Sequence, residues 1–297
     1  YKLGASVEML DKAFLWNDLI QWIEIWAQRR LLKHEKITML YNALEKIQAN
    51  MNNVPRSTQF ALLSVLKREL PSMDPRQVSN NLYYLGRMKF TPIDSLRKVS
   101  TLSFFSSCHL MESSEFANGF WALIEIFKIK NEDEDFNEKK LIHGFLQQRH
   151  VMNARDLSTL TTSLKNTGYN ADTIPTCILE ILYDAIVRVD MDATSISLLL
   201  FSLGGMKFEF KELPSVVKST LRQAMNMFFA FYTPRELFWT IIGCSRMKIM
   251  WDTFSEESKQ EFSIALAQNL KEPSMKRPSV MYILRAMTKI SVTWEDL

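Results

Sequence analysis

A helical phrase that returns about every 40 residues is the feature that most constrains this chain. Its clearest copy, residues 196–208, is an apolar run that ends in small residues, a methionine and a lysine. Related phrases cover residues 80–90 and 241–249. A phrase that returns at one period indicates a repeat protein, in which each unit buries its apolar face against the next.

Four apolar anchors define the repeat, at positions i, i+4, i+7 and i+10 of each copy. This spacing places all four on one face of an α-helix. The copy that starts at Leu157 is the weakest, because it contains Thr161 and Thr167, and we expect Leu160 to take the place of Thr161. Seven copies start 38 to 43 residues apart: Ile37, Tyr41, Leu44, Ile47; Val78, Leu82, Leu85, Met88; Phe116, Phe120, Leu123, Ile126; Leu157, Thr161, Leu164, Thr167; Ile196, Leu200, Leu203, Met206; Leu237, Ile241, Cys244, Met247; and Val280, Leu284, Met287, Ile290.

Each copy predicts the first helix of a helical hairpin, and the segment after it predicts the second. The first helices are expected over residues 35–50, 75–90, 114–129, 154–167, 194–207, 234–249 and 278–290. The second helices are expected over residues 56–70, 93–110, 138–152, 174–190, 213–230 and 254–270.

Start and stop signals agree with these boundaries. Side chains that can accept a free backbone N–H group precede five first helices, and Gly168 is expected to end the fourth one. The starting residues are Asp74, the pair Ser113–Ser114, Asn153, Asp192 and Thr233.

One amphipathic hairpin cannot bury its apolar face alone, so we predict an all-α fold, an α-solenoid of stacked helix pairs with a repeat of about 40 residues. Residues 1–34 are expected to form an N-terminal capping region with one helix over residues 10–31. Residues 35–297 are expected to form six to seven repeats, the last one truncated. The sequence starts with Tyr1, which indicates a fragment or a product that lost a leader.

Composition narrows the classes of function. The chain has 36 basic and 33 acidic residues, so a nucleic-acid surface requires that basic residues gather on one face. Cys108, Cys177 and Cys244 lie far apart in apolar helical segments, which predicts buried free thiols in a reducing compartment. No run of 18 apolar residues occurs, so we expect no membrane partner.

The sequence carries no signal for catalysis. The histidines, His34, His109, His143 and His150, do not stand at metal-ligand spacing from cysteines or carboxylates. No phosphate-binding glycine loop and no GxSxG motif occur. We therefore expect no enzyme activity, no cofactor, no metal and no small-molecule substrate.

Basic residues stand close to the last anchor of every first helix. In a stacked array they would form a stripe that can follow a phosphate backbone. Basic residues near helix C-termini also offset the helix dipole, so the recurrence in every repeat favours the stripe more than any single residue does. The candidates for RNA binding are Lys46, Arg87, Lys89, Lys128, Lys165, Lys207, Arg246, Lys248 and Lys289.

Polar residues in the first turns of these helices are further candidates, above all Arg76, Arg155 and Arg235. They differ between repeats, as an array that reads bases requires and as ordinary exposed turns also do. Aromatic residues lie in the middle of the helices, where packing between repeats is favoured over stacking on bases. They are Tyr83, Trp121, Phe201 and Trp239.

The segments 81–88, 120–126 and 200–206 resemble the "aromatic-Ala-Leu-Ala-Lys-Leu-Gly" helix of the octotricopeptide and heptatricopeptide repeat families. Those families are close to the repeat regions of FAST-kinase-like and RAP-domain proteins. The resemblance covers residues 37 to 290. Tyr84 departs from it, because Ala or Ser is usual there, and the chain has no RAP domain.

The resemblance implies an organellar RNA-binding protein, mitochondrial or alternatively plastid, that acts in RNA metabolism or translation. Some members look like lineage-specific components of mitochondrial ribosomes. The implied partners are single-stranded or ribosomal RNA and subunits of ribosomes or other ribonucleoproteins. The alternative is a protein-binding scaffold of the HEAT or armadillo type without nucleic acid. A continuous basic concave face would favour RNA, and an apolar and acidic concave face would favour a protein ligand.

Overall fold

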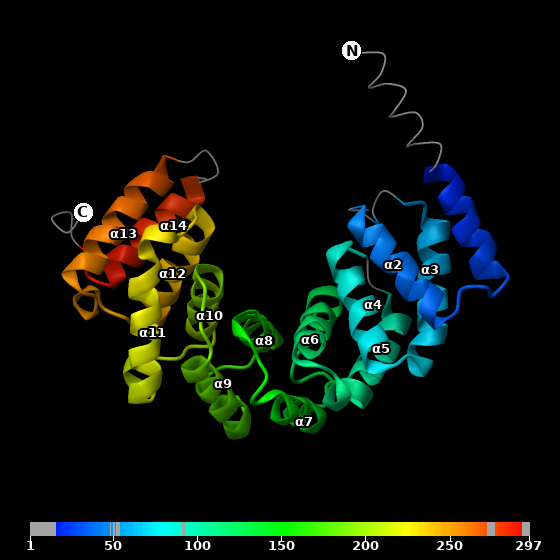
Figure 1. The fold of residues 1–297 in the computed structure, drawn as a ribbon, viewed down its shortest axis with the longest axis horizontal. Coiled ribbons are helices and arrows are strands. Elements are labelled where there is room, and N and C mark those ends of the chain that lie inside the picture. Colours follow the sequence, from blue (N-terminus) through cyan, green and yellow to red (C-terminus); the bar gives the residue numbers. More distant parts are fainter. Residues whose placement is uncertain are drawn as a thin grey trace, which may run out of the picture.

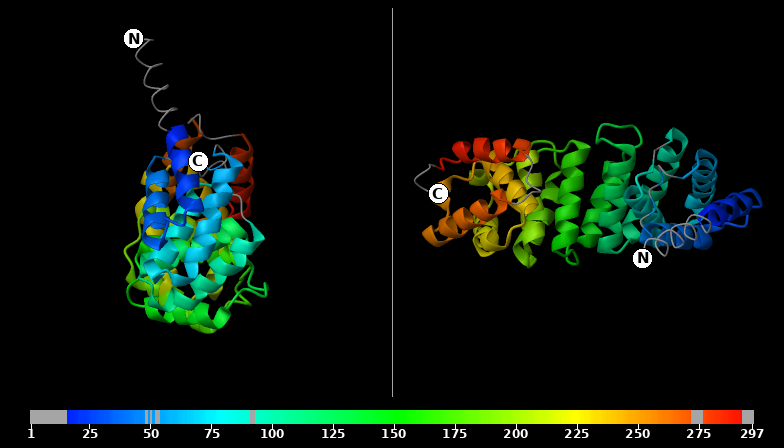
Figure 2. Two further views of the ribbon diagram at one scale, coloured as in Figure 1. Left: turned by 90° about the vertical axis from the view of Figure 1, so that its right-hand side faces the viewer. Right: turned by 90° about the horizontal axis from the view of Figure 1, so that it is seen from above.

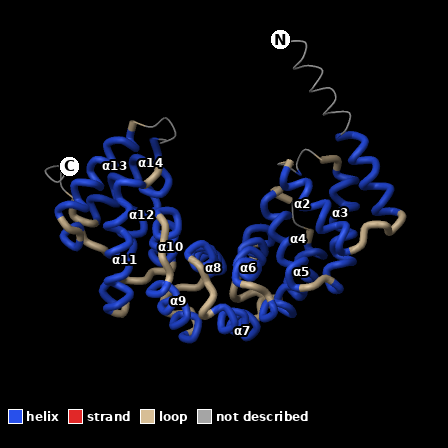
Figure 3. The backbone as a smooth tube through the Cα atoms, viewed as in Figure 1, coloured by secondary structure: helices blue, strands red, loops and turns tan. Residues whose placement is uncertain are grey.

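The computed structural model describes residues 16–47, 49, 51, 54–90, 93–271 and 277–292, which form helices and loops and no strand (Figure 3). The first helices of the hairpins are α2 (His34–Lys46), α4 (Pro75–Arg87), α6 (Ser113–Phe127), α8 (Ala154–Thr167), α10 (Ala193–Gly205), α12 (Pro234–Met247) and α14 (Arg277–Lys289). The second helices are α3 (Arg56–Glu69), α5 (Asp94–Ser107), α7 (Glu138–Gln148), α9 (Thr176–Arg188), α11 (Ser215–Phe228) and α13 (Glu256–Leu270).

The hairpins stack in sequence order into an open arc (Figure 1). The first helices pack against one another along the concave side, and we call them the inner layer. The second helices cover the convex side as the outer layer. Seen from above, the helices lie side by side across the long axis of the molecule (Figure 2). The predicted all-α solenoid is therefore confirmed.

An additional helix over residues 16–28 precedes the first hairpin, where the sequence predicts one over residues 10–31. Residues 10–15 lie outside the described part, as do residues 48 and 50 of the first predicted inner helix. Three outer helices end in 3₁₀ turns, which the sequence does not distinguish from a continuing α-helix. These turns are Leu70–Ser72, Cys108–Leu110 and Phe229–Phe231.

Most of the predicted anchors lie in the core, but Val280 and Leu284 are only half-buried, and two further residues differ from the expectation. Ile47, directly after the end of α2 at Lys46, is 61% exposed, whereas Met88 and Met206 at the equivalent places are buried. Thr161 is fully buried and donates its hydroxyl hydrogen to the carbonyl of Leu157 at 2.7 Å, so Leu160 adds to the core and does not replace it.

Four of the five predicted N-caps are confirmed, at Asp74, Asn153, Asp192 and Thr233. The prediction for the pair Ser113–Ser114 is wrong, because Glu112 caps α6 and forms a reciprocal capping box with Glu115. The buried Ser113 hydroxyl instead donates to the carboxylate of Asp156 in the next repeat, at 2.7 Å.

Backbone hydrogen bonds join consecutive repeats at the C-terminal ends of the inner helices. In each bond, an N–H group just after one inner helix donates to a carbonyl at the end of the next inner helix. These bonds satisfy backbone groups at the seam and fix the register between repeats. They run from Met51 to Met88 (3.2 Å), from Asn131 to Thr167 (3.0 Å), from Ala171 to Met206 (2.8 Å) and from Trp251 to Ile290 (2.9 Å).

The seam between α10 and α12 requires glycine. A β-carbon added to Gly243 would lie 2.6 Å from the carbonyl carbon of Leu200 and 2.8 Å from its oxygen. A β-carbon on Gly204 would lie 3.0 Å from the carbonyl oxygen of Gly243. Because these neighbours are backbone atoms, a side chain could be accommodated only if the helices moved apart.

We expect the substitution Gly243→Ala to lower the free energy of unfolding by about 1–3 kcal/mol, the usual cost of overpacking. Urea unfolding followed by circular dichroism measures this change. Gly205→Ala is the matched control, because its β-carbon would meet only the flexible side chains of Lys165 and Arg246 and no backbone atom of a neighbouring helix. Equal stability of wild type and Gly243→Ala would show that the seam does not depend on this glycine.

Candidate nucleic-acid interface

The inner helices run in the same direction, so their C-terminal ends lie along one border of the concave face, which we call the C-terminal edge. The predicted basic stripe lies on this edge, in the last turn of each helix or directly after it. All its members are exposed except Lys165, which is half-buried. They are Lys46, Arg87, Lys89, Lys128, Lys165, Lys207, Arg246, Lys248 and Lys289.

The three arginines predicted in the first turns lie on the opposite border. Inner helices of about 13 residues are about 20 Å long, so Arg76, Arg155 and Arg235 are remote from the stripe. Arg76 lies 3.7 Å from a carboxylate oxygen of Glu115, and the Arg235 guanidinium lies 4.3 Å from the ring centre of Trp239. The structure therefore divides the predicted contacts into two separate rows.

Four lysines of the C-terminal edge adopt the left-handed backbone conformation. Their φ angles are 56° at Lys89, 52° at Lys128, 64° at Lys207 and 57° at Lys248. Each directly follows an inner helix or comes one residue later, at the place where glycine is most common. The fourth repeat has Gly168 there, with φ 104°, as the sequence predicts.

Backbone bonds hold these turns closed. The N–H group of Phe208 donates to the carbonyl of Leu203 at 3.1 Å, and the N–H group of Ile249 donates to the carbonyl of Cys244 at 2.9 Å. This is the pairing that ends many helices at a left-handed residue. As the chain turns, the side chain of the left-handed residue is left on the surface, so Lys207 and Lys248 are exposed.

Helix stability does not account for lysine at this position. The left-handed conformation costs a residue with a β-carbon about 1 kcal/mol or more relative to glycine. The attraction of a cation to the C-terminal end of a helix stabilises the helix by about 0.3–1 kcal/mol. A lysine in the last turn would have the same stabilising effect without backbone strain. The recurrence of lysine in four repeats therefore points to a use for its charge.

Some of these cations have acidic neighbours and others do not. Lys128 lies 3.5 Å from Glu125, and Lys248 forms an ion pair with Glu209. The hydrogen bonds from Lys248 and Lys211 lower the pKa of Glu209. Lys89 and Lys207 form no ion pair with any residue in the part of the chain that the structure describes. Exposed ion pairs contribute little to stability and can be exchanged for pairs with phosphate.

Partly exposed aromatic rings lie between the two borders. Tyr83 and Trp121 have ring centres 5.7 Å apart, and Phe201 and Trp239 have ring centres 6.4 Å apart. Each pair joins two consecutive repeats, as the packing interpretation expects. All four rings are half-buried rather than buried, so the concave face keeps aromatic surface open to solvent.

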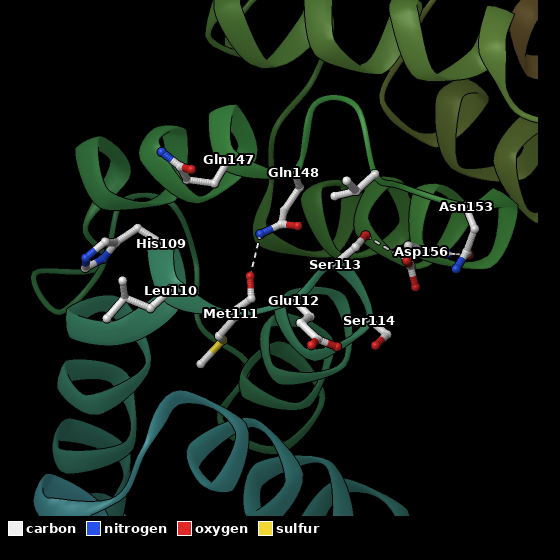
Figure 4. A pocket seen from close by; sticks show the side chains of 11 residues that line it. His109, Leu110, Met111, Glu112, Ser113, Ser114, Gln147, Gln148, Asn153 and Asp156 are labelled. Carbon is white, nitrogen blue, oxygen red and sulfur yellow. Dashed lines mark hydrogen bonds between the residues drawn. The ribbon is translucent and has the colours of Figure 1, made fainter.

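A polar pocket of about 470 Å³ lies on the border opposite the stripe, near the start of α6 and α8 (Figure 4). Several of its polar groups have partners within the protein. Gln148 donates to the carbonyl of Met111 at 2.7 Å, and the side chain of Asn153 accepts the N–H group of Asp156 at 2.9 Å. The pocket therefore belongs to the caps and turns that start these helices.

The described residues contain no group of three or more histidine, cysteine or acidic side chains that could hold a metal ion. Burial raises the pKa of Cys108 to about 11 and that of Cys244 to about 12, which keeps both thiols protonated near neutral pH. Cys177 is free but only half-buried, so the prediction of three buried thiols is wrong for this residue. None of the helices in the described ranges is both long and apolar enough to span a membrane.

Comparison with known proteins adds no assignment. No protein-family model matches the chain, and no curated protein is significantly similar to it.

We expect Lys207→Gly to raise the free energy of unfolding by about 0.5–1 kcal/mol, because glycine removes the left-handed strain. The reverse change, Gly168→Ala, introduces that strain and should lower the stability by a similar amount. Urea unfolding of the two variants beside wild type measures both effects. A loss of stability in Lys207→Gly would show that the lysine side chain stabilises the turn.

Proposed function

We propose that this protein is a non-catalytic RNA-binding protein that holds a single strand along the C-terminal edge of its concave face. The observation that carries the proposal is the strained lysine that follows the inner helix in four repeats. A row of cations on one border of an array can neutralise successive phosphates of one strand. The net charge is nearly balanced, at +3, which agrees with binding by one edge on which basic residues gather rather than by the whole surface.

Single-stranded RNA fits the concave face better than a duplex does. The half-buried rings of Tyr83 and Trp121 lie between the two borders of the concave face, whereas cations already lie over the rings of Phe201 and Trp239. Bases of a single strand are free to stack on such rings, whereas bases in a duplex are not. In such a complex, the phosphates would contact the basic residues of the edge. The bases would point toward the middle of the concave face and contact its aromatic rings.

The resemblance to octotricopeptide and heptatricopeptide repeats supports the cellular part of the proposal. It favours RNA of a mitochondrion, or alternatively of a plastid, and work in RNA metabolism or translation. A fixed place on ribosomal RNA in a mitochondrial ribosome is one form of this role, and it would bring protein subunits of that particle into contact with the chain.

A protein-binding scaffold is the second candidate, and the outer layer favours it. Large apolar side chains are exposed on all six outer helices, among them Phe60 on α3 at 66%, Leu102 on α5 at 56% and Ile264 on α13 at 52%. Such side chains on a convex surface suit contacts with other proteins. A protein partner on the outer layer is compatible with RNA on the inner layer.

We expect wild-type protein to bind a mixed pool of single-stranded RNA with an affinity that falls steeply as salt rises. The double variant Lys89→Gly/Lys207→Gly should bind more weakly, and the slope of log affinity against log salt should be smaller by about 1.4, or about 0.7 for each lost phosphate contact. Fluorescence anisotropy across a salt series measures both.

The matched control removes two lysines from outer helices, Lys67→Ala on α3 and Lys139→Ala on α7, and should leave the slope unchanged. Equal slopes for wild type and the double glycine variant would reject the stripe. Absence of RNA binding by wild type even at low salt would favour the scaffold.

A further inference from the structure

Two cations from different repeats converge over one glycine of the concave face. The Lys165 ammonium, on α8, lies 4.5 Å from the ring centre of Phe201 on α10. The Arg246 guanidinium, on α12, lies 5.1 Å from the same ring centre. A β-carbon on Gly205 would lie 2.5 Å from Lys165 Cδ and 3.9 Å from Arg246 Nη1, so both side chains cross the space that this glycine leaves open.

The tight seam between α10 and α12 produces this convergence. A β-carbon on Gly204 would lie 2.9 Å from the β-carbon of Arg246, so α12 approaches α10 closely enough to lay Arg246 on its surface. The repeat in between, with Phe201 and Gly205, forms the floor under both cations. Their arrangement is thus a product of the same glycines that the seam requires.

Neither cation has an acidic partner. No ion pair or hydrogen bond joins Lys165 or Arg246 to another residue within the described ranges, whereas Arg87 on the same edge lies 3.4 Å from Glu45. Burial lowers the pKa of Lys165, and the positive charge of Arg246 lowers it further. Because Lys165 is half-buried and Arg246 is exposed beside it, the two like charges repel each other until an anion joins them.

A pocket of about 400 Å³ adjoins Lys165 at the C-terminal ends of α6 and α8. Two other lysines of this pocket are engaged, because Lys128 lies 3.5 Å from Glu125 and Lys130 donates to the carbonyl of Asn166 at 2.7 Å. Lys165 is therefore the pocket lysine with a free ammonium. The lining of this pocket includes Glu125 and Asn166 but neither Arg246 nor Gly205, so the pocket lies beside the cation pair and not over the glycine.

We infer that Lys165 and Arg246 together bind one phosphate group over Gly205. An ammonium and a guanidinium donate charge-assisted hydrogen bonds to different oxygens of a phosphate, and the Phe201 ring limits access of water from below. The expected source is a phosphate of the RNA strand, so this inference rests on the proposed function. A small free phosphate compound offers the same chemistry.

Acetylation of lysines, followed by mass spectrometry, tests the site in the intact protein. Labelling rates are compared for protein alone, with a mixed single-stranded RNA pool, and with inorganic pyrophosphate. We expect RNA to slow the labelling of Lys165 at least about threefold and to leave Lys139, exposed on α7, unchanged.

A matched pair of double variants provides the second readout. Lys165→Met/Arg246→Met keeps the apolar contact with Phe201 and should weaken RNA binding about tenfold. Lys67→Met/Lys139→Met removes two charges from the outer layer and should leave affinity unchanged. Thermal unfolding of each variant shows whether it is folded, and the labelling experiment needs no variant.

The outcomes separate this inference from the proposed function. RNA binding with unchanged labelling of Lys165 and unchanged affinity of Lys165→Met/Arg246→Met would overturn the inference alone. Protection of Lys165 by pyrophosphate without RNA binding would support a phosphate site and reject RNA as its source. No protection by either compound, in protein that does not bind RNA, would overturn both.

Discussion

The left-handed turn that ends the inner helices from α4 to α14 is the constraint on which the rest of the structure depends. A left-handed residue reverses the chain there, as Lys207 does after α10. The turn then sends the chain into the outer layer, and nearby N–H groups reach the next repeat, as in the bond from Ala171 to Met206. One backbone conformation thereby closes the helix, sets the register of the stack and presents a side chain on the concave border.

Glycine is the residue that this turn favours, and only the fourth repeat has it. Lysine at the same place in four repeats makes the turn less stable than glycine would, and it keeps a charge on the surface. Proteins commonly accept local strain where function requires it. The Lys165–Arg246 pair over Gly205 follows the same pattern, because half-buried Lys165 lies beside exposed Arg246 and neither has an acidic partner among the described residues. Both features lie on one edge, and a single bound strand would explain them together.

The period of the apolar anchors was enough to predict the all-α solenoid and most helix boundaries. The caps at Asp74, Asn153, Asp192 and Thr233 were equally visible, because each side chain bonds within its own first turn. Glu112 was not predicted, although its box with Glu115 is equally local, because serine is the more common capping residue; Ser113 instead donates to Asp156, 43 residues away. A contact at that distance leaves no local signal in the sequence.

The sequence predicts where the candidate site lies along the chain, but it does not predict the backbone conformation of its lysines. The recurrence of basic residues placed the stripe at the helix ends, yet no property of Lys89 or Lys207 in the sequence indicates a left-handed backbone. The convergence of Lys165 and Arg246, 81 positions apart in the numbering, depends on how closely two helices pack. Such packing is decided by Gly204 and Gly243 together, and neither glycine alone identifies the site.

The most direct measurement is RNA affinity after Gly168→Lys, which fills the gap between the left-handed lysines of the neighbouring repeats, with Gly168→Ala as the control for backbone strain. We predict that the lysine variant is less stable than wild type by about 1 kcal/mol, and yet binds single-stranded RNA more tightly, with a steeper salt dependence. Affinity equal to that of Gly168→Ala would contradict the claim that this edge binds the strand.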